Sequence, residues 1–123
     1  QADELEAINQ FVQSNIAPDE AFMTYPDTGT YNYIFNRKFF HRFPQVTMSW
    51  FNDQWFADFF KELQTNPPPF VIIQRDLPDG WKAVHLGPEA NRKKHNALMD
   101  EIRTQYTLVQ QTPLSDIYQL SNK

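Results

Sequence analysis

The 123-residue chain contains no cysteine and only three glycines. Without cysteine it has no disulfide framework, no thiolate zinc site and no cysteine nucleophile. Three glycines leave almost no material for a loop that cradles phosphate, and the sequence carries neither a Walker motif nor a dinucleotide fingerprint. These absences remove several common classes of enzyme and leave nucleotide binding without support.

A basic surplus is also lacking, because eleven Lys and Arg face fifteen Asp and Glu and give a net charge of −4. A dedicated nucleic-acid-binding protein normally carries the opposite balance, so we expect no nucleic-acid partner. No apolar run approaches the roughly 20 residues that cross a bilayer. Since a helical pattern begins at Gln1 itself, we interpret residues 1–123 as a single soluble domain excised from a larger protein.

Hydrophobic residues make up 41% of the chain, enough for a packed core, and three segments have the apolar spacing of amphipathic helices. They are Asp3–Asn15, a segment from Asn52 or Asp53 through Gln64, and Pro88–Gln105. In the first two, the apolar side chains span an arc of about 140°, which predicts one buried face. The second helix has a capping residue at Asn52 or Asp53, and Pro88 is predicted to be the first residue of the third. A shorter helix is predicted over Thr30–Asn36.

The strand signals are strongest in the second half of the chain. Phe70–Ile73 is apolar on both faces and rich in β-branched residues, as is typical of the central strand of a covered sheet. Glu20–Tyr25 is predicted to be a second buried strand, and alternation over Val46–Trp50 favours a third. Tyr106–Gln111 and Ile117–Leu120 are predicted to form an antiparallel hairpin.

The alternation of helices and strands indicates an α/β fold. We predict a small, mostly parallel sheet flanked by helices, with the C-terminal antiparallel hairpin at one edge. A Pro/Gly loop is expected over Leu77–Gly87. No repeat, low-complexity tract or linker divides the chain.

Two strand ends are candidate ligand sites, because open α/β sheets bind ligands beyond the carboxyl ends of their strands. Asp27 and Thr28 follow one strand, and Arg75 and Asp76 follow another. These residues are predicted either to line a small polar pocket or to serve only as helix caps and ion pairs.

The three histidines stand at no metal-ligand spacing, and we expect neither a metal nor another cofactor. His95 lies beside the apolar stripe of its helix, which favours a hydrogen-bonded, partly buried side chain. Trp81 and His85 share the expected loop and either line a cleft or cover the edge of the core. A small independent hydrolase or transferase built on Asp27, Asp76 and His85 is one hypothesis for this sequence; no catalytic residue is assigned.

Two basic groups stand out in this acidic chain. Arg37 and Lys38 are followed by His41 and Arg42, with phenylalanines between them, whereas residues 92–94 form a second group on a helix. Aromatic and cationic side chains together favour contact with anionic lipid headgroups. The alternative is a solvated loop beside core phenylalanines.

The segment order resembles the C-terminal soluble extracytoplasmic domain of polytopic membrane glycosyltransferases. These are the enzymes related to dolichyl-phosphate-mannose protein mannosyltransferases and to the aminoarabinose transferases that act on lipid A. The matching segments are Tyr31-Asn32-Tyr33-Ile34-Phe35-Asn36-Arg37, Arg42-Phe43, Pro69-Phe70-Val71-Ile72-Ile73 and Ile117-Tyr118-Gln119-Leu120.

The resemblance implies a non-catalytic accessory domain of a glycosyltransferase that uses a polyprenyl-phosphate-linked sugar donor. The catalytic acidic residues of that family lie between transmembrane helices outside this chain, so none is carried over. The implied location is the extracytoplasmic face of a bacterial membrane, which is periplasmic in a Gram-negative cell. The implied partners are the transmembrane portion of the same chain, with anionic lipid headgroups or the glycosyl acceptor.

Six residues are candidates for interaction because they lie near strand ends or in the basic–aromatic segment. They are Tyr31, Arg37, Arg42, Arg75, Asp76 and Trp81. The alternative function is a stand-alone soluble module that binds a partner through exposed aromatic side chains without sugar chemistry.

Overall fold

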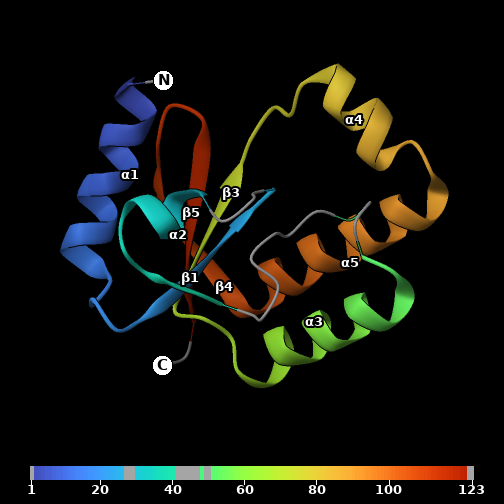
Figure 1. Ribbon diagram of the computed structural model, residues 1–123, viewed down its shortest axis with the longest axis horizontal. Helices are drawn as coiled ribbons and strands as arrows, with labels where there is room; N and C mark the ends of the chain where they lie inside the picture. Colours follow the sequence, from blue (N-terminus) through green and yellow to red (C-terminus); the bar gives the residue numbers. More distant parts are fainter. Residues whose placement is uncertain (1, 27–29, 41–47, 49–50, 122–123) are drawn as a thin grey trace.

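A computed structural model of the protein describes residues 2–26, 30–40, 48 and 51–121. Its helices and strands alternate along the chain for most of its length (Figure 1). In chain order they are α1 (Ala2–Asn15), β1 (Ala21–Tyr25), α2 (Thr30–Ile34), β2 (Lys38–Phe39), α3 (Asp53–Thr65), β3 (Phe70–Gln74), α4 (Asp79–Leu86), α5 (Glu89–Gln105), β4 (Tyr106–Gln111) and β5 (Ser115–Leu120).

The strands form one five-stranded sheet in the order β2-β1-β3-β5-β4. β1 pairs in parallel with both β2 and β3, and β3 pairs antiparallel with β5, which pairs antiparallel with β4. This confirms the predicted α/β class, with a parallel group of strands and an antiparallel hairpin at one edge. Phe70–Gln74 lies at the centre, as its apolar, β-branched sequence predicts.

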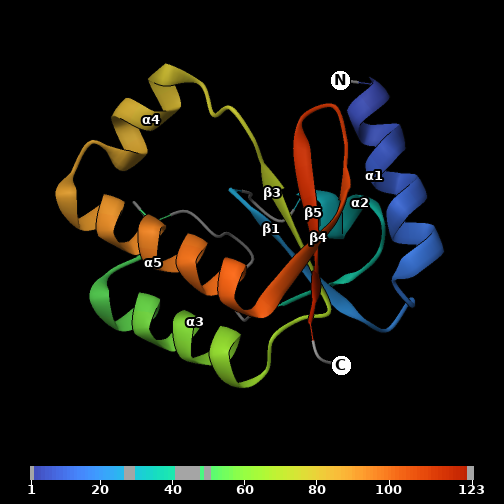
Figure 2. The ribbon, with the colours of Figure 1, turned by 180° about the vertical axis from the view of Figure 1, so that it is seen from behind.

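Helices cover both faces of the sheet (Figures 1 and 2). On one face, Ile8 and Val12 of α1, with Phe35 directly after α2, pack against side chains that include Ile72 of β3. On the other face, α3 and α5 pack against the alternate side chains of the same strands, including Val71. Each fully buried apolar side chain of this size contributes about 1.5–3 kcal/mol of burial free energy, so β3 supports two cores at once.

The ends of α3 agree closely with the sequence pattern. The Asn52 side chain accepts a hydrogen bond from the Trp55 N–H at 2.8 Å, which satisfies a donor that the first turn leaves without a helical partner. α5 begins at Glu89, and Pro88 precedes it as the N-cap residue instead of being its first residue.

The prediction of a loop over Leu77–Gly87 is wrong, because Asp79–Leu86 forms α4. Proline and glycine bracket this helix instead of breaking it, with Pro78 before it and Gly87 after it. A Cβ at Gly87 would overlap the carbonyl oxygen of Ala83, so the end of α4 requires glycine there. None of the α4 side chains is buried.

The second strand along the chain is a short one that the sequence pattern did not predict. Lys38–Phe39 pairs with β1, whereas Val46–Trp50 lies outside the described residues except for Met48, which is buried in the core and belongs to no strand. The Asn32 side chain fixes the position of β2, because its amide donates to the carbonyl oxygens of Phe22 and Lys38 at 2.9 and 2.7 Å. A side-chain amide thus ties β2 to β1, a contact that periodicity does not reveal.

Candidate functional site

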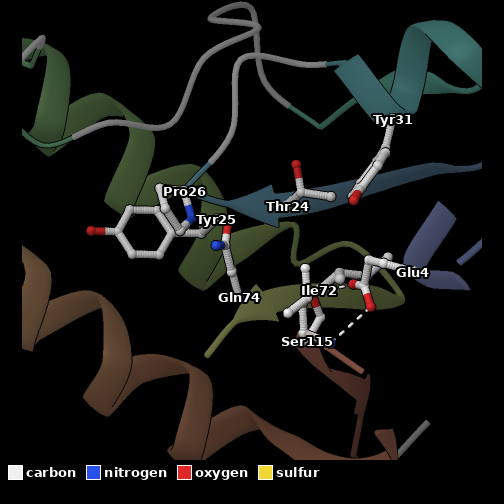
Figure 3. Close-up of a pocket in the computed structure, with 9 residues that line it drawn as sticks. Glu4, Thr24, Tyr25, Pro26, Tyr31, Ile72, Gln74 and Ser115 are labelled. Atoms are coloured by element: carbon white, nitrogen blue, oxygen red, sulfur yellow. Dashed lines mark hydrogen bonds between the residues drawn. The ribbon is translucent and has the colours of Figure 1, made fainter. Parts of the chain in front are cut away.

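A pocket of about 120 Å³ opens at the carboxyl ends of the parallel strands β1 and β3 (Figure 3). This is the edge of the sheet at which α/β proteins hold their ligands. The loop between β4 and β5 and the first turn of α1 complete its wall. The described residues that line it are Glu4, Thr24, Tyr25, Pro26, Tyr31, Ile72, Gln74, Leu114 and Ser115.

Glu4 is the charged group of this wall, and its side chain is only 3% exposed. Its carboxylate accepts hydrogen bonds from the Leu114 N–H at 2.8 Å, the Ser115 hydroxyl at 2.8 Å and the Thr112 hydroxyl at 3.0 Å. A buried carboxylate is tolerated when donors surround it in this way. Glu4 therefore fastens the first turn of α1 to the hairpin loop.

Arg75 holds the same loop through a second set of contacts. Its guanidinium donates to the carbonyl oxygens of Thr112 at 2.8 Å and Pro113 at 2.9 Å, and to that of Ser115. It also forms an ion pair with Asp116 at 2.8 Å, and both side chains are largely buried. The planar five-donor group suits this cluster of acceptors. Arg75 is thus engaged with the protein's own backbone.

Gln74 supplies the polar group that faces the pocket from β3. Its side chain is half-buried, and Figure 3 shows its amide turned toward Tyr25 and Pro26. Among the described residues the amide has no hydrogen-bond partner, so a donor and an acceptor both remain for a ligand or water. Because the described wall holds a carboxylate and no Lys, Arg or His, the pocket suits an uncharged or cationic hydrogen-bonding group and disfavours phosphate.

Tyr25 also connects the pocket to α5, because its hydroxyl lies 2.7 Å from Nδ1 of His95. Burial raises the pKa of Tyr25 well above its ordinary value. Burial, with the nearby charge of Arg103, lowers the pKa of His95. Both shifts favour the neutral pair, so the contact is a hydrogen bond between uncharged groups. His95 is therefore partly buried and hydrogen-bonded, as its position beside the apolar stripe of the helix predicts.

Arg37, a predicted interaction residue, lies at the C-terminal end of α1. Its guanidinium donates to the Ile16 carbonyl oxygen through Nη2 at 2.8 Å and Nε at 3.2 Å, and to that of Phe35 at 2.8 Å. A cation at the last carbonyl groups of a helix satisfies acceptors that the helix leaves open. Arg37 thus links α1 to the segment that follows α2.

The other predicted residues are spread over the molecule. Tyr31 lines the pocket from α2, where its ring stacks on Phe35 with centroids 5.9 Å apart. Asp76 is exposed and adopts a left-handed backbone conformation, with a φ of 50°, just after β3. Trp81 lies on α4, with its ring centroid 4.6 Å from that of His85 and the two rings tilted by 35°. Arg42 lies outside the described residues, as does Asp27 of the hydrolase hypothesis.

Sequence reasoning missed Glu4 and Gln74. Glu4 lies on the buried face of α1, four residues before Ile8, so a charged residue within an apolar stripe was the available signal. Gln74 gave no such signal, since a polar residue at a strand end is ordinary.

Comparison with protein-family models, curated proteins and solved structures finds no match for this chain. Within the described part of the chain, no helix combines the length and apolarity needed to span a bilayer. The same residues include no group of three or more His, Cys, Asp or Glu side chains placed to hold a metal ion.

Proposed function

We propose that this chain is a non-catalytic accessory domain of a membrane glycosyltransferase that uses a polyprenyl-phosphate-linked sugar donor. The observation that carries the proposal is that the charged side chains near the strand ends bind other parts of the same chain. Glu4 and Arg75 hold the hairpin loop, and Arg37 holds the end of α1. A catalytic acid or base must instead reach the reacting atoms. These side chains therefore stabilise the fold, and in this proposal the domain acts through its surface.

The electrostatics of the pocket support a role with the acceptor instead of the donor. A polyprenyl phosphate would bring a negative charge toward the Glu4 carboxylate, with no cation in the described wall to offset it. A cavity of about 150 Å³ holds a benzene molecule, so a pocket of this size admits a group no larger than part of one sugar ring. Hydroxyl groups of a glycosyl acceptor donate to the Gln74 Oε1 and accept from its Nε2.

The exposed edge at β2 supports an orientation toward the membrane. Lys38 and Phe39 belong to the basic–aromatic segment, and both are exposed at the end of the sheet opposite the hairpin. A cationic and an aromatic side chain exposed at the same edge both favour contact with an anionic lipid surface. In this proposal the domain lies on the extracytoplasmic face, tethered through the transmembrane portion of the same chain.

The first experiment compares the full-length parent protein, a version without residues 1–123, and the isolated domain. Each is incubated with a radiolabelled polyprenyl-phosphate sugar in membrane vesicles. We expect transfer by the parent, reduced transfer after the deletion, and no turnover by the domain alone. Turnover by the domain alone would refute a non-catalytic role. A parent reading frame without hydrophobic spans of about 20 residues would refute the membrane assignment.

A second experiment sediments the domain with liposomes that contain or lack anionic lipid. Lys38→Glu should reduce binding to the anionic liposomes, whereas Lys61→Glu, an exposed change of the same charge on α3, should not. Binding that ignores lipid charge and survives Lys38→Glu would remove the proposed lipid contact.

The second candidate function is a soluble partner-binding module, and α4 favours it. Its Val84 side chain is 67% exposed although it is apolar, and no side chain of this helix is buried. Short isolated helices are marginal in water, so a helix held this loosely gains stability when a partner covers it. A parent protein that is soluble and lacks transferase activity would favour this second function over the first.

A further inference from the structure

The strand β4 forms an open edge of the sheet (Figure 2). Among the described residues it pairs with β5 on one side and with no strand on the other, and every one of its residues after Tyr106 is exposed. Leu108 and Val109 are 46% and 45% exposed, although both are apolar. Together with Gln110 and Gln111 they line a shallow groove of about 300 Å³.

The backbone hydrogen bonds indicate which groups of β4 face outward. The Thr112 N–H donates to the Ser115 carbonyl oxygen, and the Ser121 N–H donates to that of Gln105. In an antiparallel pair, hydrogen-bonded positions alternate with positions whose N–H and C=O point away from the partner strand. From the Gln105 end, the alternation makes Thr107 a hydrogen-bonded position and turns the N–H and C=O of Leu108 outward. From the Thr112 end, it makes Gln110 a hydrogen-bonded position and turns the N–H and C=O of Gln111 outward, with the irregularity between the two halves.

β4 lacks the usual protection of an edge strand. Natural edges carry lysine, proline or inward-pointing charges, or are very short. The twelve residues from Thr104 to Ser115 include no Lys, Arg, His, Asp or Glu, in a chain that is 21% charged. The opposite edge contrasts with it, because β2 is two residues long and includes Lys38. The bulge beside Val109 is the one such device within β4.

We propose that β4 pairs with β4 of a second copy of this chain, antiparallel and across a twofold axis, so that the two sheets become continuous. A twofold axis places each strand opposite its own sequence, and an uncharged strand opposes no like charges when it does so. The outward N–H and C=O groups of Leu108 and Gln111 gain partners, and the apolar side chains of the groove are covered. This interface does not depend on the function proposed above.

The test measures the mass of the isolated domain by sedimentation equilibrium from about 1 μM to about 1 mM, a range that reports weak dimers as well as tight ones. We expect a monomer–dimer equilibrium. Leu108→Lys places two ammonium groups near the axis and should raise the dissociation constant at least tenfold. Val84→Lys makes the same change at an exposed apolar position on α4 and should leave it unaltered.

Amide hydrogen exchange locates the interface independently of any substitution. As the protein concentration rises, exchange at the Leu108 and Gln111 amides should slow, whereas the Thr107 and Gln110 amides, which face β5, should not change. A monomer at every concentration overturns the proposal. So does a dimer that Val84→Lys dissociates and Leu108→Lys leaves intact, because it would place the interface on α4.

Discussion

Replacing Glu4 with alanine tests how strongly one buried carboxylate holds the pocket wall. The substitution removes an acceptor that the Leu114 N–H and two hydroxyl groups share. Each hydrogen bond to a charged group contributes about 1.5–3 kcal/mol, but the three do not add fully. The hydroxyl groups rotate, and that of Thr112 already lies 3.3 Å from the Ser115 carbonyl oxygen. The Leu114 N–H is fixed by the backbone and has no such freedom.

We therefore expect Glu4→Ala to lower the free energy of unfolding by about 3 kcal/mol, which is the cost of leaving one fixed donor and part of a hydroxyl network without an acceptor. For a domain of this size that loss lowers Tm by about 10 °C. Urea unfolding at pH 7, followed by far-UV circular dichroism, measures the free energy. The free energy of unfolding of Glu4→Gln should lie between those of the unsubstituted protein and Glu4→Ala, because the glutamine amide oxygen still accepts from one donor.

The matched control is Glu6→Ala, which removes a carboxylate from the same end of α1. Glu6 is exposed, and among the described residues its carboxylate accepts only from Gln10, at 3.1 Å, so its loss should change stability by no more than about 0.5 kcal/mol. Both substitutions remove one negative charge, but only Glu4 lies in the first turn of α1, where the helix dipole adds about 0.3–1 kcal/mol to its loss. If Glu4→Ala costs no more than Glu6→Ala, the buried carboxylate does not hold the hairpin loop in the way described.

Three further predictions concern the framework around the site. Asn52→Ala should cost about 1 kcal/mol in urea unfolding through the lost cap of α3, and a loss no larger than that of the exposed control Lys61→Ala would contradict this. Asn32→Ala should speed hydrogen exchange in β2 while leaving β5 protected, and uniform loss of protection would argue against a local role. Burial lowers the pKa of His95 below its unfolded value of about 6.5, so the unfolded state binds more protons on acidification. Stability should therefore fall as the pH drops through about 6.5, and His95→Asn should flatten that slope; equal slopes for the two proteins would refute it.

The sequence predicts those parts of the fold whose cause is local. β3 is apolar on both faces, the first turn of α3 has its cap in the adjacent residue, and the hairpin strands are separated by a proline-containing turn. In each case the signal and the structure lie within a few residues. α4 shows the limit of this reasoning, because the same proline and glycine residues that suggest a loop also mark the two ends of a short helix.

The pocket depends on contacts between distant parts of the chain, which periodicity does not report. The pocket lies at the carboxyl ends of two parallel strands, but the described residues that line it include neither Arg75 nor Asp76. Arg75 follows β3 as expected, yet its guanidinium turns to the hairpin loop because four acceptors converge there. Glu4 is separated from Ser115 by 111 positions, and only the folded chain brings the two together.

The hairpin loop that Glu4 and Arg75 hold has a consequence for biosynthesis. β5 lies between β3 and β4, and it leaves the ribosome after every other strand and helix of the described fold. Until it emerges, one side of β3 has no neighbouring strand, and the hairpin loop that brings the three donors to Glu4 is not closed. Pairings between segments so far apart in sequence form slowly. We therefore expect a nascent chain that ends before residue 115 to remain protease-sensitive, and resistance to appear in a single step once β5 is available.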